Sequence, residues 1–186
     1  GAGKLVFDND GDACPYVDLP NGFFTNLYSV NGSFSIEWWA NATREGGSWQ
    51  RFFSFGESTT TGSPSANTPA PEPGEHGETC PRESGNGADY FDVIAKRGGA
   101  SNFRLEVNDI SGGVNFIGDY GFASNQEFHW VLTWDAACNR VTLYQDGVSV
   151  FTANDINSQT LSEINDVNNW IGRPAWNGNA FFDGDF

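Results

Sequence analysis

The chain has 186 residues, a length that suits one domain. Its formal net charge is −15 at pH 7, with 9 Lys and Arg against 24 Asp and Glu. We therefore expect no binding to nucleic acid, because neutralising phosphates needs clustered cations. No run of about 18 apolar residues occurs, so we expect no segment to insert into a membrane.

Short segments of alternating or β-rich residues predict strands, separated by turns that contain Gly, Asn and Asp. In chain order these segments are 4–7, 16–19, 33–41, 50–56, 89–96, 102–108, 114–118, 127–135, 140–153, 168–172 and 179–186. Asp146-Gly147 lies between two β-rich runs and predicts a hairpin. We expect at most one short helical turn, within 158–167. The pattern predicts an all-β antiparallel sandwich or barrel.

Alternation along the segment 33–41 predicts which side chains share a face of the sheet. Phe34, Ile36, Trp38 and Ala40 point one way, and Ser35, Glu37, Trp39 and Asn41 point the other. Segment 57–88 differs from the rest, because it is rich in Pro, Gly, Ser, Thr and Glu and has no large apolar residue. We expect a loop inserted in a single domain that spans 1–186. Its first half has the composition of an O-glycosylated stalk, with an ordinary disordered insertion as the alternative.

The three cysteines are Cys14, Cys80 and Cys138, which leaves one outside any single disulfide. If consecutive strands alternate in direction, Cys80 and Cys138 lie at the same end of the sandwich. We therefore favour a Cys80–Cys138 disulfide. Asn31 and Asn41 begin N-glycosylation sequons, which give weak support for secretion.

Asp8, Asp10 and Asp12 alternate with Asn and Gly in a stretch that resembles the start of a calcium loop. An EF-hand loop starting at Asp8 would need a carboxylate at its twelfth position, which is Leu19. That interpretation fails, and two remain. The stretch is either a polar turn or a structural calcium site in which a divalent ion relieves the repulsion of three carboxylates.

Several motifs occur in an order that resembles the laminin-G-like, concanavalin-A-like jelly-roll family. They are "LVFDNDGDACPYVDLP" (5–20), "GSFSIEWWA" (32–40), "HWVLTWD" (129–135), "VTLYQDGVSV" (141–150), "NWIGR" (169–173) and "FFDG" (181–184). The resemblance implies a two-sheet jelly roll in which Trp39 and Trp134 fill the core. It also implies a closing strand after the last motif, which the chain lacks. We expect another chain or further sequence to complete that edge.

The enzymes of this sandwich class that cleave laminarin carry E-x-D-x-E or E-x-D-x-x-E on one strand, which places two catalytic carboxylates on one face. Neither pattern occurs here, so a glycoside hydrolase is the least favoured alternative. Loop aromatics instead suggest sugar contacts, because a flat ring stacks on a sugar face. The candidates are Trp176 with Asn177, Trp49 and Tyr120. Capping the end of the sandwich is the alternative role for each.

We predict a non-catalytic module, extracellular or on the cell surface, that recognises carbohydrate or a glycosylated partner in adhesion. We expect it to belong to a larger protein, with calcium as the one candidate cofactor. The alternative is a structural block of an extracellular assembly. Such a block would self-associate through an edge strand.

Overall fold

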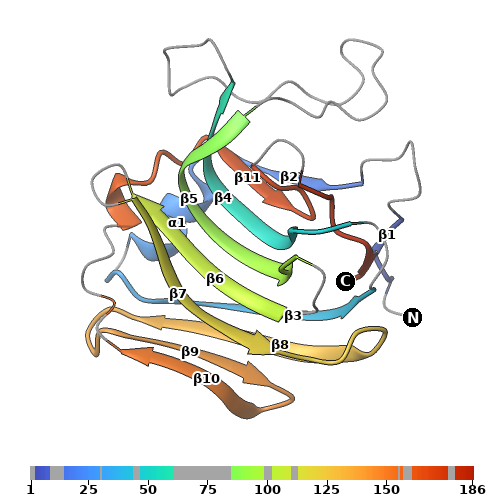
Figure 1. Ribbon diagram of the computed structural model, residues 1–186. Helices are drawn as coiled ribbons and strands as arrows, with labels where there is room; N and C mark the ends of the chain where they lie inside the picture. Colours follow the sequence, from blue (N-terminus) through green and yellow to red (C-terminus); the bar gives the residue numbers. More distant parts are fainter. Residues whose placement is uncertain are drawn as a thin grey trace.

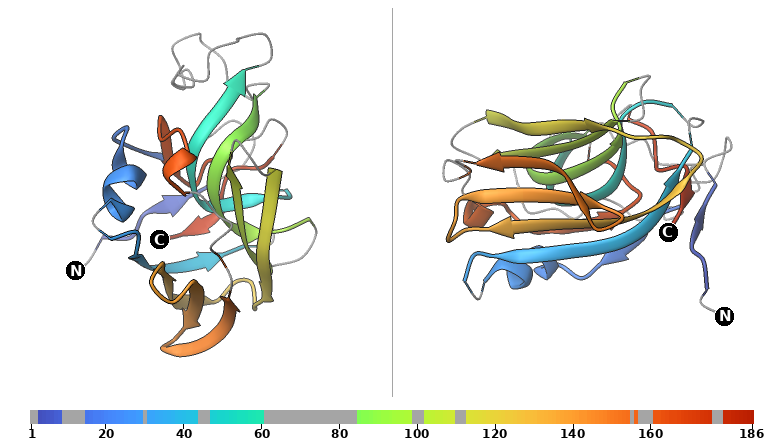
Figure 2. Two further views of the ribbon diagram at one scale, coloured as in Figure 1. Left: turned by 90° about the vertical axis from the view of Figure 1, so that its left-hand side faces the viewer. Right: turned by 90° about the horizontal axis from the view of Figure 1, so that it is seen from below.

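The computed structural model describes residues 3–8, 15–29, 31–43, 47–60, 85–98, 102–109, 113–154, 156, 161–175 and 179–186. These residues form two stacked sheets of six strands each, in which every pairing is antiparallel (Figures 1 and 2). The predicted all-β jelly-roll sandwich is confirmed. No described helix is long and apolar enough to cross a membrane.

We name the two sheets I and II. Sheet I has the order β1 (Val6–Phe7), β12 (Gly184–Asp185), β3 (Phe34–Ala42), β8 (Glu127–Asp135), β9 (Arg140–Gln145) and β10 (Val148–Asn154). Sheet II has the order β2 (Val17–Leu19), β11 (Asn168–Ile171), β4 (Gln50–Thr60), β5 (Gly85–Lys96), β6 (Asn102–Asp109) and β7 (Gly113–Gly121). β1 and β2, the strands on either side of the acidic stretch, thus belong to different sheets.

The hydrophobic core lies between the sheets and is largely aromatic. Alternation in β3 is as predicted, with Phe34, Trp38 and Ala40 buried and Glu37 exposed. Trp134 is buried, but the predicted core position of Trp39 is wrong, because its side chain is 53% exposed. Successive side chains of a strand point to opposite faces, so Trp38 and Trp39 cannot both enter the core.

One helix was not predicted. α1 (Phe23–Tyr28) has six residues, which is less than two turns and too short for a periodic pattern. Its Phe24 is completely buried and packs against the rings of Phe91 and Phe55, with ring centroids 4.9 and 5.3 Å away. The single turn expected in 158–167 is the 3₁₀ helix η2 (Leu161–Glu163).

The loop boundaries predicted at 57 and 88 are also wrong. β4 continues to Thr60 and β5 begins at Gly85, and their pairing extends to Thr60↔Gly85. A hairpin ladder can continue through Ser, Thr and Gly because its hydrogen bonds are made by the backbone. The remainder of the insertion lies outside the described residues.

The predicted hairpin at Asp146-Gly147 is confirmed. It joins β9 to β10, and both residues have positive φ, 51° and 78°. The short β12 lies between β1 and β3, where Gly184 pairs with Phe7 and Ala42. Of the predicted strand at 179–186, only β12 is a strand.

Sheet II is bowed. Figure 1 shows β4, β5 and β6 curving with their hollow side turned away from sheet I. We call this side the outer face of sheet II. The opposite face carries the core residues Phe91 and Val93 of β5 and Leu105 of β6.

Candidate ligand-binding site

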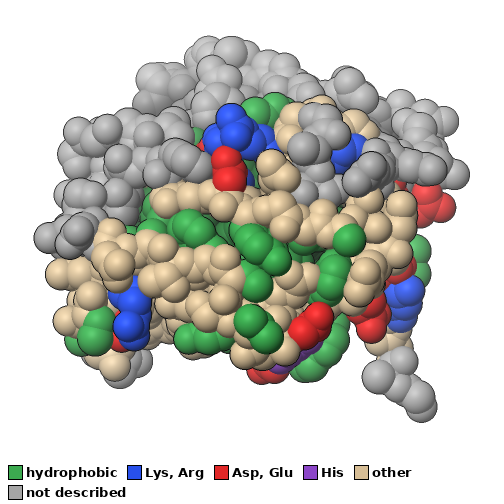
Figure 3. Space-filling view, turned by 60° about the horizontal axis from the view of Figure 1, so that its bottom comes forward, with side chains coloured by type: hydrophobic (Ala, Val, Ile, Leu, Met, Phe, Trp, Pro, Cys, Tyr) green, Lys and Arg blue, Asp and Glu red, His purple; other side chains and the backbone are tan. Residues whose placement is uncertain are grey.

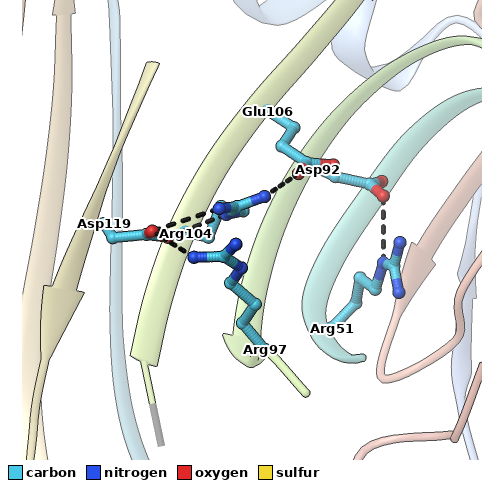
Figure 4. A network of polar contacts seen from close by, with 6 residues as sticks. All are labelled: Arg51, Asp92, Arg97, Arg104, Glu106 and Asp119. Carbon is cyan, nitrogen blue, oxygen red and sulfur yellow. Dashed lines mark hydrogen bonds and ion pairs between the residues drawn. The ribbon is translucent and has the colours of Figure 1, made fainter. Parts of the chain in front are cut away.

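Charged side chains gather on the outer face of sheet II. The core residues of β5 and β6 alternate with Asp92, Arg104 and Glu106, which therefore point outward. With Arg51 of β4, Arg97 and Asp119 of β7, these form a set that we call the outer-face cluster (Figure 4). It holds three arginines and three carboxylates.

The deepest part of the outer-face cluster is an ion pair between Arg51 and Asp92. Arg51 Nε lies 2.9 Å from Asp92 Oδ2, and the two side chains are 2% and 0% exposed. Ser54 Oγ donates to the other carboxylate oxygen at 2.6 Å. Arg51 Nη1 also donates to the carbonyl of Trp49, and the side-chain oxygen of Asn179, turned toward the guanidinium, accepts from Nη1 at 2.9 Å. This ion pair thus holds the backbone at Trp49.

The more accessible part of the outer-face cluster is centred on Arg104. Its Nε and Nη2 donate to both oxygens of Asp119 at 2.8 and 3.1 Å, and its Nη1 donates to Glu106 at 2.8 Å. Arg97 donates to Asp119 from the other side at 2.8 Å. Hydrogen bonding to Asp119 raises the pKa of Arg104, so its charge is fixed. Positive and negative side chains therefore alternate in the series Arg97, Asp119, Arg104 and Glu106.

Two aromatic side chains adjoin the outer-face cluster. The guanidinium of Arg104 lies 5.7 Å from the centre of the half-buried Trp49 ring. Trp49 has φ of 65°, which turns the chain just before β4. Tyr90 is buried on the same face. Burial raises its pKa far above the usual range, and the charges of Asp92 and Glu106 add to that increase. Its phenol therefore stays protonated.

A further arginine lies on this face near β2. The guanidinium of Arg173 stacks on Trp170 at 4.3 Å and on Tyr16 at 4.7 Å. Trp170 pairs with Ser54 in register, which places it beside the buried Arg51–Asp92 pair. Arg173 is 4% exposed, and its Nη1 has no hydrogen-bond partner in the described part of the chain. Such a guanidinium nitrogen can donate a hydrogen bond to an anion.

The structure separates the aromatic residues that the sequence suggested as sugar contacts. Trp49 lies at the outer-face cluster. Tyr120 was expected in a loop but lies in β7 and pairs with the core residue Phe103. Its hydroxyl donates to Gln145 of sheet I at 2.9 Å, so it points inward. Trp176 and Asn177 lie outside the described residues.

The other predicted site residues are only partly described. Asp8 is exposed after β1, whereas Asp10 and Asp12 lie outside the described residues. Within the described ranges, no three His, Cys, Asp or Glu side chains are grouped to hold a metal. The calcium site stays a prediction.

Glycosylation and disulfide formation also stay predictions. Asn31 is exposed, and Asn41 is half-buried with its Nδ2 donating to Asp185 at 3.3 Å. Cys138 is an exposed free thiol, and its predicted partner Cys80 lies outside the described residues.

Sequence reasoning missed the outer-face cluster, although a signal was present. Arg104 and Glu106 are two residues apart in a predicted strand, so both must point to the same face. Asp92 stands directly opposite Glu106 across β5 and β6. Each of these carboxylates is engaged by its own arginine, an arrangement suited to rigid hydrogen bonding.

Comparison with known proteins supports the fold. No family model and no curated protein matches the chain. Among solved structures, the CBM40 of the Ruminococcus gnavus IT-sialidase bound to α2,3-sialyllactose aligns at TM-score 0.56 and 16% identity, covering 82% of this chain and 71% of that one. Domain 4 of the GH43 extracellular arabinanase AbnA from Geobacillus stearothermophilus, in complex with arabinotriose, aligns at TM-score 0.54 and 14% identity, over 98% of this chain and 78% of that one.

A third similar structure is a much longer chain. The K499G mutant of the NanB sialidase from Streptococcus pneumoniae aligns at TM-score 0.62 and 16% identity, over 99% of this chain but 24% of that one. At these identities the likeness shows a shared fold, a jelly-roll β-sandwich. The narrower resemblance to the laminin-G-like family remains an expectation.

Proposed function

We propose that this chain is a non-catalytic carbohydrate-binding module whose ligand contacts the outer face of sheet II beside Trp49. The observation that carries the proposal is the half-buried Trp49 ring under Arg104, with Asp119 and Arg97 fixed beside it. A flat ring with directed donors and acceptors matches a sugar, which has an apolar face and a rim of hydroxyls. Two solved modules of this fold hold sialyllactose and arabinotriose.

The absence of catalysis is also part of the proposal. Glycoside hydrolysis needs one carboxyl group as the acid and a second, ionised one as nucleophile or base. Asp92 and Glu106 are the adjacent carboxylates on this face, and both accept hydrogen bonds from arginines. In this arrangement both carboxylates form ion pairs with arginines, which fits a binding surface better than an acid and nucleophile pair.

We extend the proposed site to Trp176 and Asn177. They lie between Ala175, which packs with Trp170, and Asn179, which contacts Arg51. We further propose that the module acts outside the cell, in recognition of a glycosylated partner. The arabinanase whose domain 4 shares this fold is an extracellular enzyme, which supports this location.

Titration of ¹⁵N-labelled protein tests the proposal. We expect α2,3-sialyllactose or arabinotriose to shift the indole N–H of Trp49 and amides of β4–β7. Trp49→Ala should abolish these shifts. Trp39→Ala, which removes an exposed tryptophan from sheet I, should leave them unchanged. If neither sugar shifts these signals, or if Trp49→Ala binds as the wild type does, the proposed site is wrong.

A further inference from the structure

Sheet I carries an exposed aromatic surface on its outer face. Trp39 is more than half exposed, although it occupies the middle of β3, a central strand. Large aromatic side chains exposed at such positions leave apolar area in water and often mark contact surfaces. Figure 3 views this side of the molecule, where hydrophobic, acidic and histidine side chains meet near one end of the sheet.

The indole of Trp39 is held in place. Trp39 pairs with His129 of β8 in register, and the two rings stack with centroids 4.4 Å apart and planes 23° apart. His129 Nε2 lies 2.8 Å from Glu37 Oε1, and its backbone N–H donates to Asp146 at 3.0 Å. The histidine therefore supports the indole and is itself fixed from two sides. A rigid surface loses little conformational entropy when it binds a ligand.

The groups around the Trp39–His129 stack can accept hydrogen bonds. Glu37, Glu127 and Asp146 are all exposed on or beside this face. Ionised carboxylates only accept, so a ligand here must donate and must also present a flat apolar surface. Sugar hydroxyls and the C–H face of a pyranose meet both needs. A second copy of this chain, with net charge −15, would bring further negative charge to the same place.

We propose that Trp39, supported by His129, is a second carbohydrate contact, which stacks on a neutral pyranose ring while Glu37 accepts from its hydroxyls. This contact is separate from the proposed site on sheet II. The faces of stacked sheets are about 10 Å apart, with the core between them, so one sugar ring cannot reach both outer faces. Two such contacts would let one chain hold two glycan strands.

The experiment follows the indole N–H of Trp39 and the amides of β3 and β8 in ¹⁵N-labelled protein. The probes are lactose, maltotriose, cellotriose and mannotriose, each at about 20 mM, which detects dissociation constants in the millimolar range. We expect at least one probe to shift these signals. Trp39→Ala should abolish the amide shifts, and Glu37→Gln should weaken binding several-fold. Trp49→Ala is the matched control and should leave them intact.

Several outcomes would overturn the proposal. One is that no probe shifts the Trp39 signals. Another is that a lysine-rich hexapeptide, added as a further probe, shifts these signals while no sugar does, which would indicate a cationic partner. Shifts that depend on protein concentration alone would indicate self-association. Signals of β4–β7 report separately on the sheet II site, so either site can fail while the other stands.

Discussion

Removing the negative charge of Asp92 should strongly destabilise the fold. Asp92→Asn leaves the Arg51 guanidinium buried without its counter-ion, since the pair is 2% and 0% exposed. Loss of one partner of a buried pair typically costs about 3–5 kcal/mol. In a chain of this length that lowers the melting temperature by roughly 6–20 °C. Urea titration followed by tryptophan fluorescence, together with thermal melts by circular dichroism, measures both quantities.

A double-mutant cycle identifies the cause. Arg51→Met with Asp92→Leu removes both charges, so its cost should fall short of the summed single costs by about 2 kcal/mol or more. Asp119→Asn is the control, because this carboxylate is 26% exposed and its pairs should be worth about 1 kcal/mol or less. If Asp92→Asn costs less than about 1 kcal/mol, or if the two single effects simply add, the ion pair does not hold this face together.

Three further predictions concern other parts of the chain. Gly118→Ala should cost about 1–3 kcal/mol in urea unfolding, because its Cβ would collide with the ring of Phe151, and Phe151→Leu should partly rescue it. With the other two cysteines changed to serine, Cys138 should react slowly with iodoacetamide at pH 8, because hydrogen bonding to Asp135 raises the thiol pKa. Asp135→Asn should lower that pKa and speed the reaction; an unchanged rate would contradict this cause. Calcium at 100 times its dissociation constant should stabilise the chain by about 2.7 kcal/mol, an effect that EDTA or Asp8→Asn removes; an unchanged melting temperature would contradict the calcium site.

Strand periodicity predicted most of the fold because it is a local property. The segment 127–135 matches β8 at both ends, and the alternation of β3 gave the correct face for each side chain. Trp39 shows the value of that rule. Alternation predicted that its side chain lies on the face of the sheet opposite to that of Trp38. The family resemblance then wrongly assigned it to the core. α1 was missed because its single buried residue, Phe24, leaves no period to detect.

The candidate site was less predictable because it depends on pairing between distant strands. Asp92 meets Ser54 and Arg51 only through the register of β4 on β5, which includes bulges around Arg51. The hydrophobic pattern predicts which face a side chain takes, but it does not predict where a bulge shifts the register. Tyr120 shows the opposite error, since its Gly-Asp-Tyr-Gly context suggested a loop while the strand continues through it to Gly121. Local chemistry therefore identified candidate residues, but pairing decided which of them meet.

The distribution of charge indicates which ligands the outer face of sheet II would favour. Of nine basic residues in the chain, five lie on or beside this face: Arg51, Lys96, Arg97, Arg104 and Arg173. A chain with net charge −15 repels acidic ligands over most of its surface, so these cations make this face the favourable approach. The arginines of the outer-face cluster are already paired with carboxylates, whereas Arg173 forms no ion pair with a carboxylate among the described residues. We therefore expect Arg173→Met to weaken binding of α2,3-sialyllactose more than that of lactose in calorimetry. Equal losses for both sugars would show that Arg173 supports the site by packing on Trp170 and does not pair with the ligand's charge.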